Sequence, residues 1–118
     1  MEWIKIDLFN INIAFCRNDK EYKKLIKTNK LENAPLFNSR GLTIRFDDEL
    51  EKMGLIVILV DETLGEFEEL DTIIHESSNA TTMIMKYFQI EDDEFRGYLL
   101  RYMGDRIFRY INNKNDKH

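Results

Sequence analysis

Two adjacent residues in the second half of the chain have the types and spacing that could do chemistry. His75 and Glu76 are followed by two serines and then by Asn79. Residues four positions apart on a helix lie on the same face, one turn along, so His75 and Asn79 would face one site. An imidazole there could bind a metal ion, and Glu76 beside it could take a proton from a water bound to that ion.

The motif for this chemistry is H-E-x-x-H, in which two histidines hold one zinc ion. In this chain Asn79 stands where the second histidine would be. An amide oxygen is a weak zinc donor compared with imidazole, thiolate or carboxylate, so we expect the affinity for zinc to be lower by orders of magnitude. The spacing therefore indicates a degraded metal site.

The residues that follow the motif extend the pattern. They read His75-Glu76-Ser77-Ser78-Asn79-Ala80-Thr81, then an aromatic-rich turn, then Asp93-Glu94-Phe95-Arg96-Gly97-Tyr98-Leu99-Leu100. Together they resemble a family of small phage- and prophage-encoded zincin-like proteins that are described as metallopeptidases. The resemblance implies that His75 is a first zinc ligand, Glu76 the catalytic acid and base, and Glu94 a further ligand. It also implies a phage or prophage origin and a place in the host cytoplasm.

The turn between the two stretches bears on the position of Glu94. Because Glu94 follows this turn closely, in a tight antiparallel pair of helices it would face Met85 or Lys86 rather than His75. A steep crossing of the helices would change that geometry. Without a bound metal, we expect His75 to be partly buried and to hydrogen-bond to Glu94 or Tyr98.

Length and composition set the broad class. The 118 residues, 43% hydrophobic and 33% charged, suit one folded domain, which we expect to span residues 1–111, with a polar, frayed tail over 112–118. No apolar run approaches the ~18 residues of a membrane span, and the first residues do not have the pattern of a secretory signal. The single cysteine, Cys16, cannot form an internal disulfide, which favours a reducing cytoplasm.

Charge limits the classes of partner. The formal net charge is −5, and the clustered lysines of residues 20–30 have the spacing of a solvent-exposed helix face, so we expect no direct binding of nucleic acid. Acidic residues gather at 47–49 and in two further runs, Glu66, Glu68 and Glu69, and Glu91, Asp92, Asp93 and Glu94. Such runs are typical of the first turns of helices, or they could meet a basic protein. The sequence leaves self-association open.

Periodicity predicts the elements that position these residues. Alternation over 4–15 predicts a half-buried strand with a kink near Asn10, and Asn18 with Glu21 predicts the start of a helix over 19–30 that ends before Pro35. A second strand is predicted over 42–46, a short helical turn over 49–53, and a strand covered on both faces over 55–60. Two long amphipathic helices are predicted over 66–88 and 95–111, with Leu70, Ile74 and Tyr98 in their apolar stripes.

The predicted fold class is α+β: a small sheet of three or four strands, one N-terminal helix packed on it, and two long C-terminal helices, zincin-like by the resemblance. The predicted function is a non-catalytic protein-binding module acting on a host protein, with no cofactor. One alternative is a zinc-dependent metallopeptidase with an unusual ligand set. A second alternative is an acidic protein that imitates nucleic acid and inhibits a DNA-binding factor.

Overall fold

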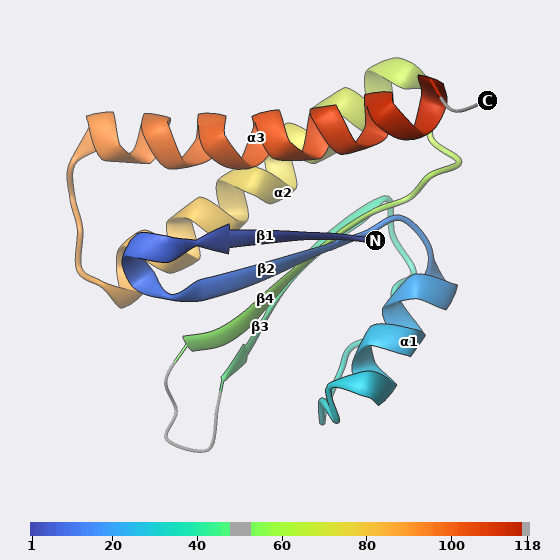
Figure 1. Ribbon diagram of the computed structural model, residues 1–118, viewed down its shortest axis with the longest axis horizontal. Coiled ribbons are helices and arrows are strands. Elements are labelled where there is room, and N and C mark those ends of the chain that lie inside the picture. Colours follow the sequence, from blue (N-terminus) through green and yellow to red (C-terminus); the bar gives the residue numbers. More distant parts are fainter. Residues whose placement is uncertain (48–52, 117–118) are drawn as a thin grey trace.

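A mixed four-stranded sheet lies between one helix on one face and two long helices on the other (Figure 1). The computed structural model describes residues 1–47 and 53–116. Along the chain the elements are β1 (Glu2–Ile6), the 3-10 turn η1 (Asp7–Phe9), β2 (Ile11–Cys16), α1 (Asp19–Thr28), β3 (Gly41–Asp47), β4 (Met53–Val60), α2 (Glu66–Tyr87) and α3 (Asp93–Asp116). The predicted α+β class is confirmed, with four strands.

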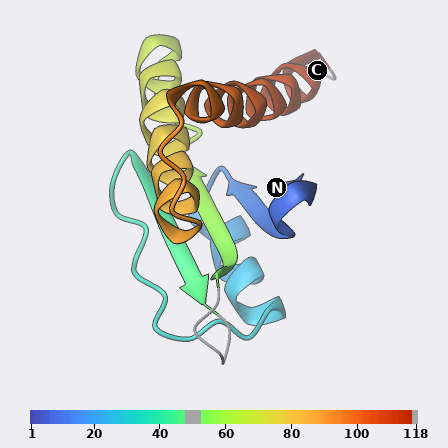
Figure 2. The same ribbon diagram turned by 90° about the vertical axis from the view of Figure 1, so that its left-hand side faces the viewer.

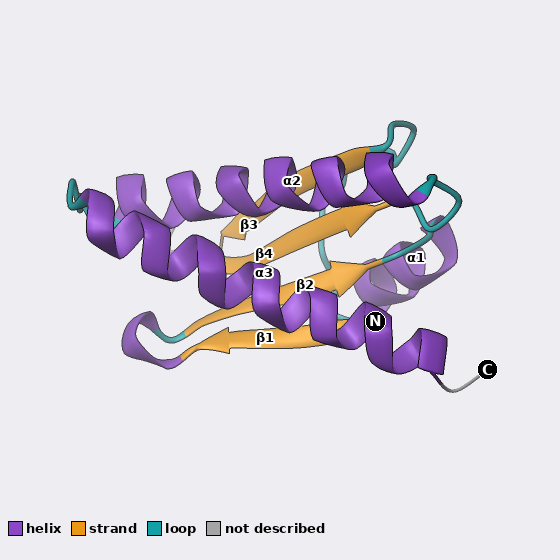
Figure 3. Cartoon of the chain, turned by 90° about the horizontal axis from the view of Figure 1, so that it is seen from above, coloured by secondary structure: helices purple, strands orange, loops and turns teal. Residues whose placement is uncertain are grey.

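The strand order in the sheet is β1-β2-β4-β3. β2 and β4 run parallel at the centre, and the outer strands β1 and β3 each run antiparallel to their neighbour. α2 lies along β3 and β4, while α3 runs across toward β1 (Figure 3). This arrangement places the middle of α2 beside the edge strand β3.

The central strands supply apolar side chains to both faces. On β4, Ile56, Ile58 and Val60 pack toward α2 and α3, whereas Val57 and Leu59 pack toward α1. All five side chains are buried. The prediction of a strand covered on both faces over 55–60 is confirmed, because a continuous apolar run has no polar face to present to water.

The N-terminal segment is two strands, so the prediction of one kinked strand over 4–15 is wrong. After β1, Asp7–Phe9 forms one turn of 3-10 helix, and Asn10 adopts the left-handed conformation with φ 53°. Asparagine tolerates this region better than most residues, so the chain reverses at Asn10. β2 then pairs with β1 in a hairpin, and Leu8 at its tip is exposed.

Helix α1 begins where the sequence predicts and ends earlier. The Asn18 side chain accepts a hydrogen bond from the Glu21 N–H at 2.8 Å, as expected for a helix N-cap. At the other end Lys30 has φ 52°, and the Leu31 N–H bonds back to the Ile26 carbonyl at 3.0 Å. This left-handed C-terminal motif stops the helix at Thr28, ahead of Pro35.

Helix α2 starts where predicted, whereas α3 starts two residues earlier and extends further than predicted. α2 begins at Glu66, and its neighbour α3 begins at Asp93. α3 continues to Asp116, so residues 112–116, expected in a frayed tail, are helical. The helical turn predicted over 49–53 lies outside the described residues except for Met53, which begins β4. None of the described helices has the length and apolarity needed to span a membrane.

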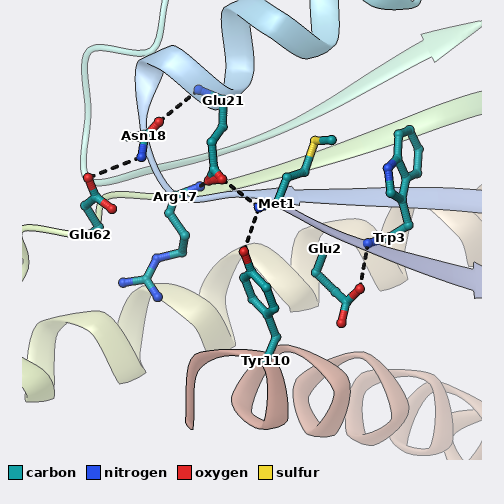
Figure 4. A network of polar contacts seen from close by, with 8 residues as sticks. All are labelled: Met1, Glu2, Trp3, Arg17, Asn18, Glu21, Glu62 and Tyr110. Carbon is teal, nitrogen blue, oxygen red and sulfur yellow. Dashed lines mark hydrogen bonds and ion pairs between the residues drawn. The ribbon is translucent and has the colours of Figure 1, made fainter. Parts of the chain in front are cut away.

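A polar network ties the start of the chain to two helices (Figure 4). The Met1 ammonium group lies 2.6 Å from Glu21 Oε2 and 2.6 Å from the Tyr110 hydroxyl. Glu21 Oε1 also accepts a hydrogen bond from the Arg17 N–H at 2.9 Å. Through these contacts β1, the start of α1 and the end of α3 are held together.

Candidate functional site

Glu76 points from the middle of α2 toward the edge strand β3. Its side chain is buried, with the residue only 6% exposed. Glu76 Oε1 accepts a hydrogen bond from Thr43 Oγ1 at 2.8 Å and another from the Asn79 amide nitrogen at 3.3 Å. The Thr43 hydroxyl also lies 3.0 Å from the Glu76 backbone oxygen. One carboxylate oxygen is therefore committed to fastening α2 to β3.

Gly41 allows this close approach. A Cβ atom at Gly41 would lie 2.5 Å from Thr72 Cγ2 and 3.0 Å from Glu76 Oε2, distances at which atoms must move apart. Thr72 itself is held in place because its hydroxyl donates to the Glu68 carbonyl at 2.7 Å. The glycine is needed here for space rather than for backbone conformation.

His75 lies beside Glu76 and faces solvent. The imidazole is 70% exposed, and its Nε2 is 4.0 Å from Glu76 Oε2, too long for a hydrogen bond. The prediction of a partly buried His75 is wrong, and no hydrogen bond to Glu94 or Tyr98 is present among the described residues. The inward positions at this level of α2 are occupied by Glu76 and Ser77, so the imidazole is left on the outside of the helix.

Glu94 does not join His75. Glu94 lies in the first turn of α3. Two residues further along, Arg96 Nη1 donates a hydrogen bond to Thr82 Oγ1 at 3.0 Å. Thr82 is seven residues beyond His75, about 10 Å along the helix. Figure 2 shows that α3 crosses α2 rather than running alongside it. The contact between Arg96 and Thr82 places the first turn of α3, with Glu94, nearer the C-terminal end of α2 than His75.

These donors do not fit zinc. Within residues 1–47 and 53–116 there is no group of three or more His, Cys, Asp and Glu side chains that could hold a metal ion. The Asn79 amide nitrogen bonds to the carboxylate of Glu76. Among the described residues His75 is the one imidazole at this site, and a single imidazole is fewer protein ligands than a zinc centre has.

The two acidic runs that carry interaction predictions occupy opposite ends of α2. Glu66, Glu68 and Glu69 form its first turn, where Glu69 pairs with Arg17. Glu91, Asp92 and Asp93 lie in and after the turn to α3, and Asp92 Oδ1 accepts from the Glu94 N–H at 2.9 Å. The expectation that such runs begin helices is confirmed for these two runs, which do not form one continuous acidic surface. Of the third run, 47–49, only Asp47 lies within the described residues, and it ends β3.

Sequence reasoning missed the partners of Glu76 and the exposure of several apolar residues. Nothing in the local pattern of 41–47 singles out Thr43 or Gly41, beyond a glycine before a strand. Leu70, Ile74 and Tyr98 were predicted in buried stripes but are exposed. Only one side of each helix can lie on the sheet, and the angle between α2 and α3 leaves these side chains outside.

The comparisons with known proteins identify no relative: no protein-family model, no curated protein and no solved structure matches this chain.

Proposed function

We propose that this chain is a non-catalytic protein-binding module built on the framework of a zincin-like peptidase helix. The observation that carries the proposal is the engagement of Glu76. Its Oε1 is bonded by Thr43 and Asn79, and the side chain is buried against β3. A general base must reach the proton that it removes, and the metal-activated water that Glu76 would serve needs ligands that this site does not supply.

Asn79 has a structural part in this proposal. Where the motif would have a second imidazole, the amide of Asn79 donates a hydrogen bond to the neighbouring carboxylate. A carboxylate buried without donors is costly, and two neutral donors offset that cost. The same positions that would form a metal site thus act as a clamp between α2 and β3.

The surface of α2 supports a role in binding. Phe67, Leu70 and Ile74 are 81%, 42% and 51% exposed and recur at helical spacing along one face. A row of exposed apolar side chains is typical of a protein-interaction site. The acidic first turn of α2 lies beside it and favours a partner with positive charge. A host protein is the partner expected from the resemblance to phage-encoded proteins.

The alternative is a metallopeptidase with an unusual ligand set. The observation in its favour is that an exposed imidazole, His75, adjoins the carboxylate of Glu76, with 4.0 Å between Nε2 and Oε2. A ligand from another molecule would be required to complete a metal site there, because the described part of this chain groups no third donor with them.

Metal analysis of the chain purified without chelator separates the two functions. We expect well below one zinc per chain, and no change when His75→Ala is compared with His118→Ala, which removes the other histidine. One zinc per chain that is lost in His75→Ala and kept in His118→Ala would overturn the non-catalytic proposal. Proteolysis that is abolished by Glu76→Gln would do the same.

A further inference from the structure

A cleft opens on the surface where α2 and α3 cross. It has a volume of about 470 Å³, and its walls include Ile73, Ile74 and Ser77 from α2 and Leu100, Gly104 and Phe108 from α3. Phe108 also lines a second hollow nearer the start of α2, together with Leu70. The two hollows share Phe108 as a lining residue, and we name them together the α2–α3 cleft. Figure 3 shows the two helices from the side on which they lie over the sheet.

The exposed apolar row of α2 borders this cleft. Ile74 lines the first hollow and Leu70 the second, and Phe67 is one turn further along the same face. Four of the eight exposed large hydrophobic side chains among the described residues lie on these two helices: Phe67, Leu70, Ile74 and Tyr98. Three of these four, Phe67, Leu70 and Ile74, follow one face of α2.

A buried hydroxyl group in the cleft has unused hydrogen-bonding capacity. Ser77 is 1% exposed, and its Oγ has no hydrogen-bond partner among the described residues. Native proteins rarely leave a buried polar atom in this state without a reason. Ser77 lies at the base of the cleft, below its apolar walls.

The charge of the residues that line the cleft favours an occupant with positive charge. Acidic side chains outnumber basic ones among the lining residues, with Glu62, Glu66, Glu69 and Asp105 against Arg17 and Arg101. Arg17 is already paired with Glu69. A second copy of this chain, with a net charge of −5, would bring more negative charge to the same place. A partner with positive charge avoids this repulsion.

We infer that the α2–α3 cleft binds an amphipathic helix of a partner protein, with its apolar face on Ile74, Leu70 and Phe108 and basic residues on its flanks. This inference rests on the proposed protein-binding function and names its surface and partner. A groove between two helices accepts the side-chain ridge of a third, and apolar anchors one turn apart suit the spacing of the α2 row.

The test uses the full chain and a synthetic peptide of leucine and lysine, about 18 residues long, with leucine on one helical face. Binding is measured by titration calorimetry at low salt, with a leucine and glutamate peptide of the same pattern as the comparison. We expect the lysine peptide to bind at least about tenfold more tightly than the glutamate peptide. We also expect its affinity to fall as salt is raised.

Two variants in the cleft and one control locate the binding. Ile74→Asp should weaken binding of the lysine peptide by about tenfold or more, whereas Leu36→Asp, an equal charge change at an exposed leucine outside the cleft, should not. Gly104→Leu fills the cleft from a position whose Cβ would meet no atom within 4 Å, and should also weaken binding without unfolding α3.

Equal affinities of the wild type, Ile74→Asp and Gly104→Leu for the lysine peptide would overturn the inference, as would no binding at about 100 μM peptide. Changes in the amide NMR chemical shifts on titration with the peptide map the binding surface. Changes confined to Glu91–Asp93 would place the binding outside the cleft, and would overturn the cleft inference but not the proposed protein-binding function. Self-association that Ile74→Asp abolishes would assign the cleft to a second copy instead. Zinc bound through His75 would overturn the proposed function, a distinct result.

Discussion

The Thr43 hydroxyl lies 2.8 Å from Glu76 Oε1 and joins the edge strand β3 to the middle of α2. In the H-E-x-x-H motif the residue at the position of Glu76 is the catalytic acid and base. In the structure the Glu76 side chain lies in a contact between α2 and β3. Asn79, one turn along on the same helix, donates to the same oxygen at 3.3 Å. The stability of the chain should therefore depend on this carboxylate and its donors.

Replacement of the donor on β3 tests the clamp. Thr43→Val keeps the shape of the side chain but leaves Glu76 with fewer hydrogen bonds, so we expect a loss of about 1–2 kcal/mol in the free energy of unfolding. Urea denaturation measures it. The control Thr28→Val, at the exposed end of α1, should stay within about 0.5 kcal/mol of the wild type. Equal effects of the two substitutions would contradict the clamp.

Two Gly→Ala substitutions should have opposite signs. Gly41→Ala places a methyl group 2.5 Å from Thr72 Cγ2 and should destabilise the chain by about 1–3 kcal/mol. Gly97→Ala lies within α3, where a Cβ would meet nothing within 4 Å, and should stabilise the chain by about 0.5–1 kcal/mol. Thermal or urea unfolding measures both. A stable Gly41→Ala variant would show that β3 and α2 are not in close contact.

The N-terminal network predicts a pH window. Burial raises the pKa of Glu21, but the hydrogen bonds from the Met1 ammonium and the Arg17 N–H outweigh it and hold this pKa below its ordinary value. For Met1, burial lowers the pKa of the ammonium, and Glu21 and Tyr110 raise it by more. Ionised Glu21 therefore stabilises the folded chain at pH values above the ordinary carboxyl pKa. This stabilisation is lost as the pH falls through the lowered pKa of Glu21. The stabilisation from the Met1 ammonium group is lost as the pH rises through the raised pKa of this group.

Glu21→Gln should therefore cost about 1 kcal/mol of unfolding free energy near neutral pH. We expect the difference from the wild type to shrink as the pH falls below the ordinary glutamate pKa and again as it rises above the ordinary pKa of an amino terminus. Denaturation curves measured across this range test the window. The matched variant Glu32→Gln, at an exposed position, should show no such profile. A pH-independent difference between Glu21→Gln and the wild type would refute the ionic part of the network.

Cys16 should be chemically inert in the folded chain. Burial, with a smaller contribution from the Glu21 carboxylate, raises the pKa of its thiol to about 12. The thiolate is the reactive form, so at neutral pH the folded chain should react with a thiol reagent only as fast as it opens. Labelling in urea gives the reference rate for the unfolded chain. Rapid stoichiometric labelling without denaturant would contradict the buried placement.

Several elements could be predicted because their signals are local. The apolar run at 55–60 specifies an interior strand, Asn18 specifies the start of α1, and the absence of glycine and proline from 67–88 permits a long α2. The presence of Asn79 at the position where the H-E-x-x-H motif has its second histidine is also visible in the sequence. Periodicity, capping and donor chemistry act over a few residues, so the amino-acid order is enough to read them.

The contacts between elements were decided by the tertiary structure. The pairing of Thr43 with Glu76 depends on β3 being the edge strand beside α2, and the separation of Glu94 from His75 depends on the turn and on the angle at which α3 crosses. The exposure of Ile74 likewise depends on which side of α2 packs against β3, β4 and α3. These outcomes join residues distant in the chain, and the packing of whole elements against the sheet determines them. Local sequence sets which elements form, and the geometry of their packing sets which of their side chains meet.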